Sequence, residues 1–146
     1  MNRNARKWVD ALRSGAYRQT TGRLRREDWT MCCLGIACDV FNKETGVGEW
    51  KYLGPVEQWD FRIDRVDGSN ISLPAAVVHW LGLRSCRGDW GPASVGSSLA
   101  SKNDDGMSFD EIAELIESQV DLFVAAGKLD VLQGKTPLGA SLRETP

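Results

Sequence analysis

Arginine and aromatic side chains gather in a basic segment, residues 13–29, and they are the first residues that could do chemistry. The segment carries Tyr17, Trp29 and five arginines: Arg13, Arg18, Arg23, Arg25 and Arg26. A guanidinium can bind phosphate through two parallel N–H bonds, and an aromatic face can stack on a planar group. The segment therefore predicts a site for a phosphate-containing ligand. A solvated basic face, or one paired with acidic groups elsewhere, would have the same composition.

The cysteines are the next candidates, and their spacing favours packing over chemistry. Cys32, Cys33 and Cys38 lie in one apolar run, whereas structural zinc sites use closely spaced cysteine pairs or accompanying histidines. Neighbouring cysteines on one helix also point too far apart for a relaxed disulfide. We expect buried free thiols in a reducing cytoplasm, and no metal site.

No catalytic constellation is evident. His79 is the single histidine, and a hydrogen-bonded, partly buried side chain accounts for it. A dyad with Cys33 or Cys86 stays open as an alternative. The chain contains no phosphate-binding glycine loop, G-x-S-x-G, H-E-x-x-H or dinucleotide fingerprint. We predict no catalytic residue and no cofactor.

Residues 103–106, Asn-Asp-Asp-Gly, invite a calcium interpretation that fails on register. If Gly106 took the sixth position of an EF-hand loop, Ser101 and Ile112 would stand where acidic ligands are needed. We therefore predict a polar turn before a capped helix.

The elements that would position these residues start with a central helix over residues 31–42, which is apolar on nearly all sides. Its interior Gly35 predicts close contact with another backbone. A short amphipathic helix over 4–14 precedes it, and the basic residues between them, from 17 to 29, should form an extended loop. Residues 43–57 predict a loop with a short strand.

The middle of the chain predicts a small sheet. Residues 58–66 alternate as a half-buried strand, with Trp59, Phe61 and Ile63 on one side. A turn over 67–70 could lead into a strand over 71–73 and form a hairpin. Pro74 then opens a short helix, and residues 84–98 form a long irregular loop.

The last helix has the clearest boundaries. Ser108 and Glu111 form a capping box, and Gly127 is a natural stop. Its apolar stripe comprises Phe109, Ile112, Ala113, Ile116, Val120, Phe123 and Val124. The sequence thus predicts one α+β domain over residues 1–128, with about four helices packed around a short antiparallel sheet, and a poorly ordered tail over 129–146.

Charge is distributed unevenly along the chain. Residues 1–26 carry eight basic residues and one acid, whereas residues 104–121 carry seven acids and no base. The two regions could attract each other, or the first could bind an anion. The net charge of −2, the pI near 5.4 and the absence of a recognition motif argue against sequence-specific DNA binding. No apolar run approaches a membrane span, and the basic N-terminus lacks the apolar core of a secretory signal, so a cytoplasmic location is expected.

The chain resembles a family of small, largely uncharacterised bacteriophage and prophage proteins. The matching residues are Trp8-x-x-Ala-Leu-Arg-Ser-Gly15, Tyr17-x-Gln19, Gly22-x-Leu-Arg25, Cys32-Cys-Leu-Gly35 with Cys38-Asp39, and Leu99-Ala-x-x-Asn-Asp104-x-Gly-x-Ser-Phe109, followed by Ile112-Ala113 and Ile116-Glu117. They cover the first 40 residues and about 20 near the end. The resemblance implies a phage setting in the host cytoplasm, and it supplies no catalytic residues.

Several of the matching positions are polar, which suggests that the two regions meet beside the central helix around a ligand. The candidate ligand-binding residues are Arg13, Tyr17, Arg18, Gln19, Arg23, Arg25, Asp39, Asn103 and Asp104. Basic and acidic groups lining one pocket suit a ligand with phosphates and sugar hydroxyls.

The leading hypothesis is a non-enzymatic phage-type protein that binds and sequesters a small anionic, nucleotide-like ligand, such as a host immune signal. One alternative is a module that inhibits a host enzyme through the acidic face of the last helix and the loop over 84–98. Another is a nucleotide hydrolase that uses Asp104 or His79. A homo-oligomer stays open, and no membrane partner is expected.

Overall fold

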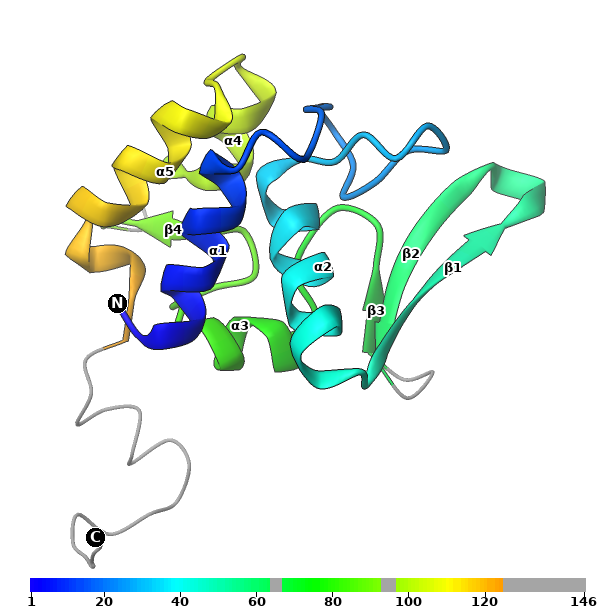
Figure 1. Ribbon diagram of the computed structural model, residues 1–146, viewed down its shortest axis with the longest axis horizontal. Coiled ribbons are helices and arrows are strands. Elements are labelled where there is room, and N and C mark those ends of the chain that lie inside the picture. Colours follow the sequence, from blue (N-terminus) through cyan, green and yellow to red (C-terminus); the bar gives the residue numbers. More distant parts are fainter. Residues whose placement is uncertain (64–66, 93–96, 125–146) are drawn as a thin grey trace, which may run out of the picture.

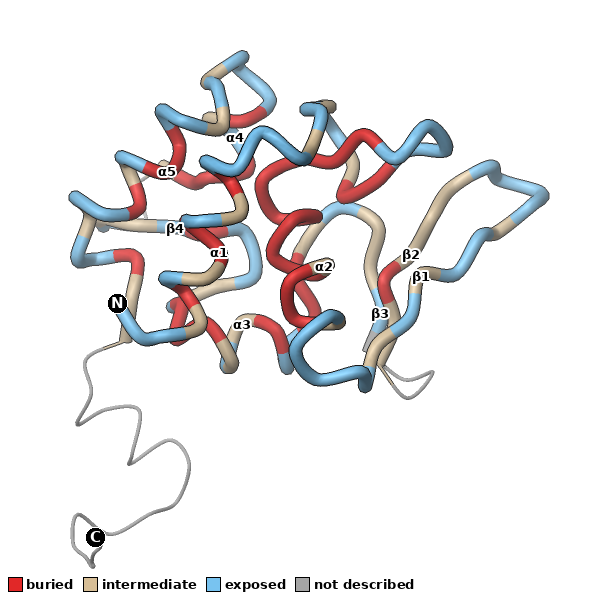
Figure 2. The backbone as a smooth tube through the Cα atoms, viewed as in Figure 1, coloured by how far each residue is buried: buried red, intermediate tan, exposed pale blue. Residues whose placement is uncertain are grey.

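Helix α2 (Cys33–Thr45) lies between a group of helices and a small sheet in the computed structural model, which describes residues 1–63, 67–92 and 97–124 (Figure 1). Its residues are buried from Cys33 to Cys38, and Figure 2 shows the buried colour along most of the helix. The helix ends at Gly46, which takes a left-handed φ of +70°. The predicted central helix is therefore confirmed, although it begins and ends slightly later in the chain.

Gly35 explains how the basic segment reaches α2. A Cβ atom at this position would lie 1.9 Å from the backbone oxygen of Leu24. The backbone N–H of Cys32 donates to the same oxygen at 3.2 Å. The predicted close backbone contact is confirmed, and the basic segment rests directly on the start of α2.

Helix α1 (Arg3–Arg13) packs on α2 through its apolar stripe. The Asn2 side chain caps the helix by accepting a bond from the backbone N–H of Ala5. Trp8 is fully buried, and its indole N–H donates to the backbone oxygen of Cys33 at 2.9 Å. This bond satisfies the indole in the core and fixes α1 against the first turn of α2.

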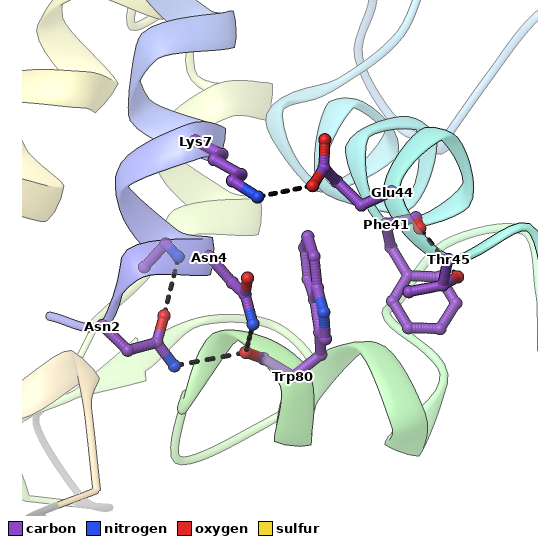
Figure 3. Close-up of polar contacts among 8 residues, drawn as sticks. Asn2, Asn4, Lys7, Phe41, Glu44, Thr45 and Trp80 are labelled. Atoms are coloured by element: carbon purple, nitrogen blue, oxygen red, sulfur yellow. Dashed lines mark hydrogen bonds and ion pairs between the residues drawn. The ribbon is translucent and has the colours of Figure 1, made fainter.

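Helix α3 (Ala75–Leu81) closes the lower side of this helix group. The side chains of Asn2 and Asn4 both donate to the backbone oxygen of Trp80, at 3.2 and 3.0 Å (Figure 3). The Trp80 ring meets Phe41 of α2 edge-on, with 5.4 Å between centroids. Polar and aromatic contacts together fix α3 to both neighbouring helices.

The main sheet has three antiparallel strands in the order β1 (Gly48–Leu53), β2 (Gln58–Ile63) and β3 (Asp67–Ser69). The prediction of a strand from residue 58 is confirmed as far as Ile63. The predicted turn over 67–70 and strand over 71–73 are wrong, because β3 occupies the start of that turn. The bend comes later, where the Ser69 hydroxyl accepts bonds from the backbone N–H groups of Ile71 and Ser72, two and three residues further on.

The β1–β2 hairpin, whose connection is a 3₁₀ turn over Gly54–Val56, has one aromatic face and one charged face. Its pairing register places four aromatic side chains on the first face: Trp50 opposite Phe61 and Tyr52 opposite Trp59. Four charged side chains share the second: Glu49 opposite Arg62 and Lys51 opposite Asp60. The aromatic face is turned toward the basic segment.

The C-terminal part contains two helices where one was predicted. Helix α4 (Leu99–Asp104) includes the first half of the predicted polar turn, Asn103 and Asp104, whereas Asp105 and Gly106 form a turn as predicted. Helix α5 (Phe109–Ser118) begins at the predicted capping box. The prediction that this helix continues to Gly127 is wrong, because a 3₁₀ turn (Val120–Leu122) follows it. That turn buries Leu122 in the core, where its backbone oxygen accepts a bond from Arg84.

The loop predicted over 84–98 contains two short strands in its described part, β4 (Asp89–Trp90) and β5 (Ser97–Ser98), which pair antiparallel. Residues 93–96 of that loop and the predicted tail over 129–146 lie outside the described residues. With five α-helices and two small antiparallel sheets in the described ranges, the predicted α+β class is confirmed. No helix within those ranges is long and apolar enough to span a membrane.

Candidate functional site

A cavity of about 560 Å³ opens between the basic segment and the tip of the β1–β2 hairpin. Its lining residues come from two stretches of chain: Arg23, Arg25, Arg26, Glu27 and Asp28 on one side, and Pro55, Val56, Glu57 and Trp59 on the other. The cavity exists because the hairpin carries residues 55–59 across to the loop that rests on α2.

Arg25 is the buried cation of this cavity. It is 3% exposed, and its guanidinium carbon lies 3.3 Å from the ring centroid of Trp29 and 3.8 Å from that of Trp59. A third ring, that of Trp50, is 5.6 Å away. Burial lowers the pKa of Arg25, and the negative charge of Asp39 partly offsets this effect. Cation–π contacts therefore stabilise a guanidinium that has lost most of its water.

Three buried N–H groups in this aromatic cluster lack hydrogen-bond partners among the described residues: Arg25 Nε, Trp50 Nε1 and Trp59 Nε1. Arg25 also takes part in none of the ion pairs that those residues form. A buried donor without a partner costs on the order of 1–3 kcal/mol. Arg25 and Trp59 line the cavity, whereas Trp50 does not. The three unpartnered N–H atoms themselves are covered by the surrounding side chains, so a ligand in the cavity meets the guanidinium as a positive charge.

The loop geometry that presents Trp29 is set by local hydrogen bonds. The backbone N–H of Trp29 donates to the oxygen of Arg26 at 3.0 Å, and Trp29 takes a φ of +65°. Asp28 Oδ1 accepts bonds from the backbone N–H and the hydroxyl of Thr30, which lower the pKa of this carboxyl. A bulky residue rarely adopts this left-handed conformation, and here it places the indole over Arg25.

The other arginines of the cavity have polar partners. Arg23 Nη1 reaches across to the backbone oxygen of Glu57 at 3.4 Å. Arg26 donates through Nε to the Thr20 hydroxyl and through Nη2 to the oxygen of Thr21. Both retain further guanidinium N–H groups that can donate to a ligand.

Carboxylates share the lining with these arginines. Glu27 accepts a bond from the Tyr52 hydroxyl at 3.0 Å. Glu57 stands at the hairpin tip with a φ of +49°. The cavity therefore offers donors for phosphate oxygens and acceptors for hydroxyl or amino groups.

Tyr17 and Asp39 belong to a second cluster. The Tyr17 hydroxyl donates to Asp39 Oδ2 at 2.6 Å, and Lys43 Nζ contacts both groups at 3.1 Å. Burial, reinforced by the bond to Asp39, raises the pKa of Tyr17. The cluster fixes the start of the basic segment to α2, and neither of its two predicted residues lines the cavity.

Gln19, Asn103 and Asp104 form a third cluster. Asn103 is fully buried, and its Oδ1 accepts bonds from Gln19 Nε2 and from the backbone N–H of Cys33. Asp104 Oδ1 accepts a bond from the backbone N–H of Gly22 at 2.8 Å. These bonds join α4 to the basic segment and to α2.

Arg13 and Arg18 lie outside the cavity lining as well. Arg13 donates to Glu117 of α5 at 2.6 Å, and Arg18 donates to the backbone oxygen of Asp28 at 2.9 Å. The structure therefore brings two predicted ligand-binding residues, Arg23 and Arg25, to one cavity.

Sequence reasoning missed the hairpin side of this cavity. The alternating pattern predicts Trp59 as a strand residue, and no local signal pairs it with Arg25. Arg26 belongs to the basic segment, but it is not among the predicted ligand-binding residues. The missing information is the position of the hairpin tip, which is a tertiary contact.

The thiols do not contribute to the cavity. Cys32, Cys33 and Cys38 are buried as predicted, and Cys86 is exposed. Burial raises the pKa of Cys32 to about 11, so its thiol is protonated at neutral pH. No group of three or more potential metal ligands occurs in the part of the chain that the structure describes.

A family model described as "Domain of unknown function (DUF8296)" matches residues 1–120. No curated protein and no solved structure matches the chain. The matched range includes the basic segment, the hairpin and both C-terminal helices, and therefore every residue of the cavity.

Proposed function

This chain belongs to the DUF8296 family of domains of unknown function, and we propose that it binds and sequesters a small nucleotide-like ligand that carries phosphate. The proposal is non-enzymatic: the ligand is held, and no bond in it is broken. It places the ligand in the cavity between the basic segment and the hairpin tip.

Buried Arg25 is the observation that carries this proposal. Its guanidinium is desolvated among tryptophans, and its Nε has no partner in the described chain. Arg25 lines the cavity, so its charge attracts a phosphate bound there. Charge-assisted bonds from the guanidinium groups of the lining are about twice as strong as neutral ones. Because the folded protein has already removed most water from Arg25, binding adds the dehydration of the phosphate but little further dehydration of this guanidinium.

The dimensions and lining of the cavity suit a nucleotide-sized molecule. Small-molecule sites typically enclose about 300–1,000 Å³, and this cavity has about 560 Å³. Arg23 and Arg26 add positive charge beside Arg25, while Glu27 and Glu57 can accept bonds from ribose hydroxyls.

The setting is part of the same proposal. The resemblance to small phage and prophage proteins supports a role in the host cytoplasm, where sequestering a nucleotide signal would blunt a host immune response. Tight binding without turnover is the property that such a role needs.

Isothermal titration calorimetry with cyclic nucleotides and ADP-ribose derivatives tests the proposal. The unmodified chain should bind at least one ligand of this panel. Arg23→Ala should weaken that binding at least about tenfold, because one charge-assisted hydrogen bond contributes roughly 1.5–3 kcal/mol. Arg3→Ala is the matched control: it removes the same charge from an exposed residue at the start of α1, outside the cavity, and should change the affinity less than about twofold.

Two outcomes would contradict the proposal. One is the absence of binding to any panel member at millimolar concentration. The other is equal weakening by both substitutions, which would indicate general electrostatic attraction. The ligand recovered by heating the complex should be chemically intact.

The two alternatives stay as proposals, and two further experiments separate them from sequestration: an assay for product formation and a pull-down from host lysate. Product formation that is lost in Asp104→Ala or His79→Ala would favour a nucleotide hydrolase. Retention of a host enzyme in place of metabolites would favour an inhibitory module. Part of the acidic face proposed for that role already contacts α1, because Glu117 pairs with Arg6 and Arg13.

A further inference from the structure

Strand β1 forms one edge of the three-stranded sheet. The strand order is β1-β2-β3, and no backbone–backbone hydrogen bond links β1 to a described segment other than β2. The backbone N–H of Gly48, the first residue of β1, donates to Asn42 Oδ1 of α2 at 3.0 Å, so the free edge lies beyond Gly48. Figure 1 shows the hairpin extending away from the helices, with β1 on the side of β2 opposite β3. An edge of this kind presents N–H and C=O groups that another strand can pair with.

We propose that β1 pairs antiparallel with β1 of a second copy of this chain, about a two-fold axis that passes beside Trp50. In a symmetric antiparallel pair, one residue faces its own copy and the neighbours pair across the axis. With Trp50 at the centre, Glu49 of each copy faces Lys51 of the other. Two opposite-charge pairs then form at once.

Charge selects this register among the symmetric alternatives. Centring the pair on Glu49 would place two carboxylates directly opposite each other, and centring it on Lys51 would do the same with two ammonium groups. Like charges directly opposite destabilise a sheet. Trp50 is the centre within β1 that places Glu49 opposite Lys51.

The flanking residues fit the same register. Val47, which is 54% exposed, would face Leu53 of the second copy on the charged side of the sheet. On the aromatic side, Gly48 would face Tyr52, so the larger side chain meets a residue without one. The exposed apolar surface of Val47 would thus be covered by the second copy.

The pairing also continues a charge pattern that already exists within each sheet. Glu49 lies opposite Arg62, and Lys51 lies opposite Asp60. Across four strands the order becomes Arg62, Glu49, Lys51 and Asp60, which alternates in sign. The second copy therefore adds favourable neighbours to side chains that the first copy leaves exposed.

The expected dimer is weak, because one pair of short edge strands buries less surface than a standard interface of about 1,600 Å². It should therefore form in a concentration-dependent manner. The proposal does not depend on the ligand, since the paired residues lie outside the cavity lining.

Sedimentation velocity over a concentration series tests it with two double variants. Glu49→Lys with Arg62→Glu and Lys51→Glu with Asp60→Lys each keep opposite charges paired within the sheet but place like charges across the axis. The unmodified chain should dimerise as concentration rises, and each variant alone should stay monomeric. An equimolar mixture of the two variants should restore a dimer, because opposite charges again face each other.

Three results would overturn the proposal: a monomeric unmodified chain up to about 1 mM, a dimer that persists in both variants, or no association in the mixture of folded variants.

If a variant fails to fold, cysteine cross-linking tests the register instead. In a Cys86→Ser background, Glu49→Cys and Lys51→Cys chains should form a disulfide-linked dimer when mixed and oxidised with copper phenanthroline. Either chain alone should cross-link much less, because its own cysteines lie diagonally across the axis, and equal cross-linking would contradict the register.

Discussion

Asn103 joins three segments of the chain through one amide group. Its Oδ1 accepts bonds from Gln19 and from the backbone N–H of Cys33, while its Nδ2 donates to the backbone oxygen of Thr20 at 2.8 Å. The side chain is fully buried, so water cannot replace these bonds. The sequence predicts Asn103 as a ligand-binding residue. In the structure its side chain instead forms hydrogen bonds with the first residue of α2 and with the basic segment.

We predict that Asn103→Ala lowers the free energy of unfolding by roughly 2–4 kcal/mol, because it leaves a buried N–H and a buried carbonyl without their partner. Urea unfolding followed by circular dichroism measures this change. Asp105→Ala, at the exposed residue that follows α4, is the control and should change stability by less than about 0.5 kcal/mol. Normal stability together with lost ligand binding would instead indicate a direct contact with the ligand.

At the scale of elements, opposite charges connect the two ends of the chain. Arg6 and Arg13 of α1 each donate to Glu117 of α5 at 2.6 Å. The bonds from these arginines, that of Arg13 first, lower the pKa of Glu117 from 4.5 to about 2. The sequence allowed two roles for the basic residues: attraction to the acidic region or binding of an anion. Arg6 and Arg13 have the first role, because both pair with Glu117.

Glu117→Gln should therefore destabilise the protein at neutral pH and change its acid response. Because the folded-state pKa of Glu117 is depressed, its contribution to stability is fully present above pH 4.5 and is lost as pH falls toward 2. The difference in unfolding free energy between the two proteins should shrink through that window. Urea titrations at pH 7, 4.5 and 3 measure it, and a difference that stays constant between pH 7 and pH 3 would contradict the assignment.

At the scale of the whole molecule, burial decides which thiols can react. Cys32, Cys33 and Cys38 are in the core around α2, whereas Cys86 is exposed between α3 and β4. Burial raises the pKa of Cys32 to about 11 and that of Cys33 well above its usual value. Thiolates, which are the reactive form, are therefore suppressed in the core.

An aromatic disulfide reagent should label one of the four cysteines rapidly in the native protein at pH 7.5 and all four in denaturant. Cys86→Ser should abolish the rapid native labelling while leaving three sites in denaturant. Mass spectrometry of labelled peptides identifies the sites. Rapid native labelling at Cys32 would show that the core opens at the start of α2.

Local sequence patterns predicted those helices and strands whose boundaries are set by residues close by in the sequence. The capping box of Ser108 begins α5, and Gly15 follows α1 within two residues of its end. The alternation of Trp59 and Phe61 predicted β2. Gly35 also predicted a backbone contact. A glycine inside a helix lowers the stability of that helix, so its presence indicates that a larger side chain would not fit there.

Tertiary structure decided what local patterns could not. Helix α5 ends at Ser118 because Leu122 packs into the core beside the chain that follows α3, and β3 depends on pairing with β2. An arginine side chain can bind phosphate, carboxylate or an aromatic ring equally well. The residue type therefore could not show that Arg13 pairs with Glu117 whereas Arg25 lies among tryptophans.

The sequence alone determined the α+β class and the basic segment, because these follow from periodicity and composition. The cavity required the hairpin tip, residues 54–59, to lie against residues 23–28, and such a contact between distant segments depends on the packing of the whole chain.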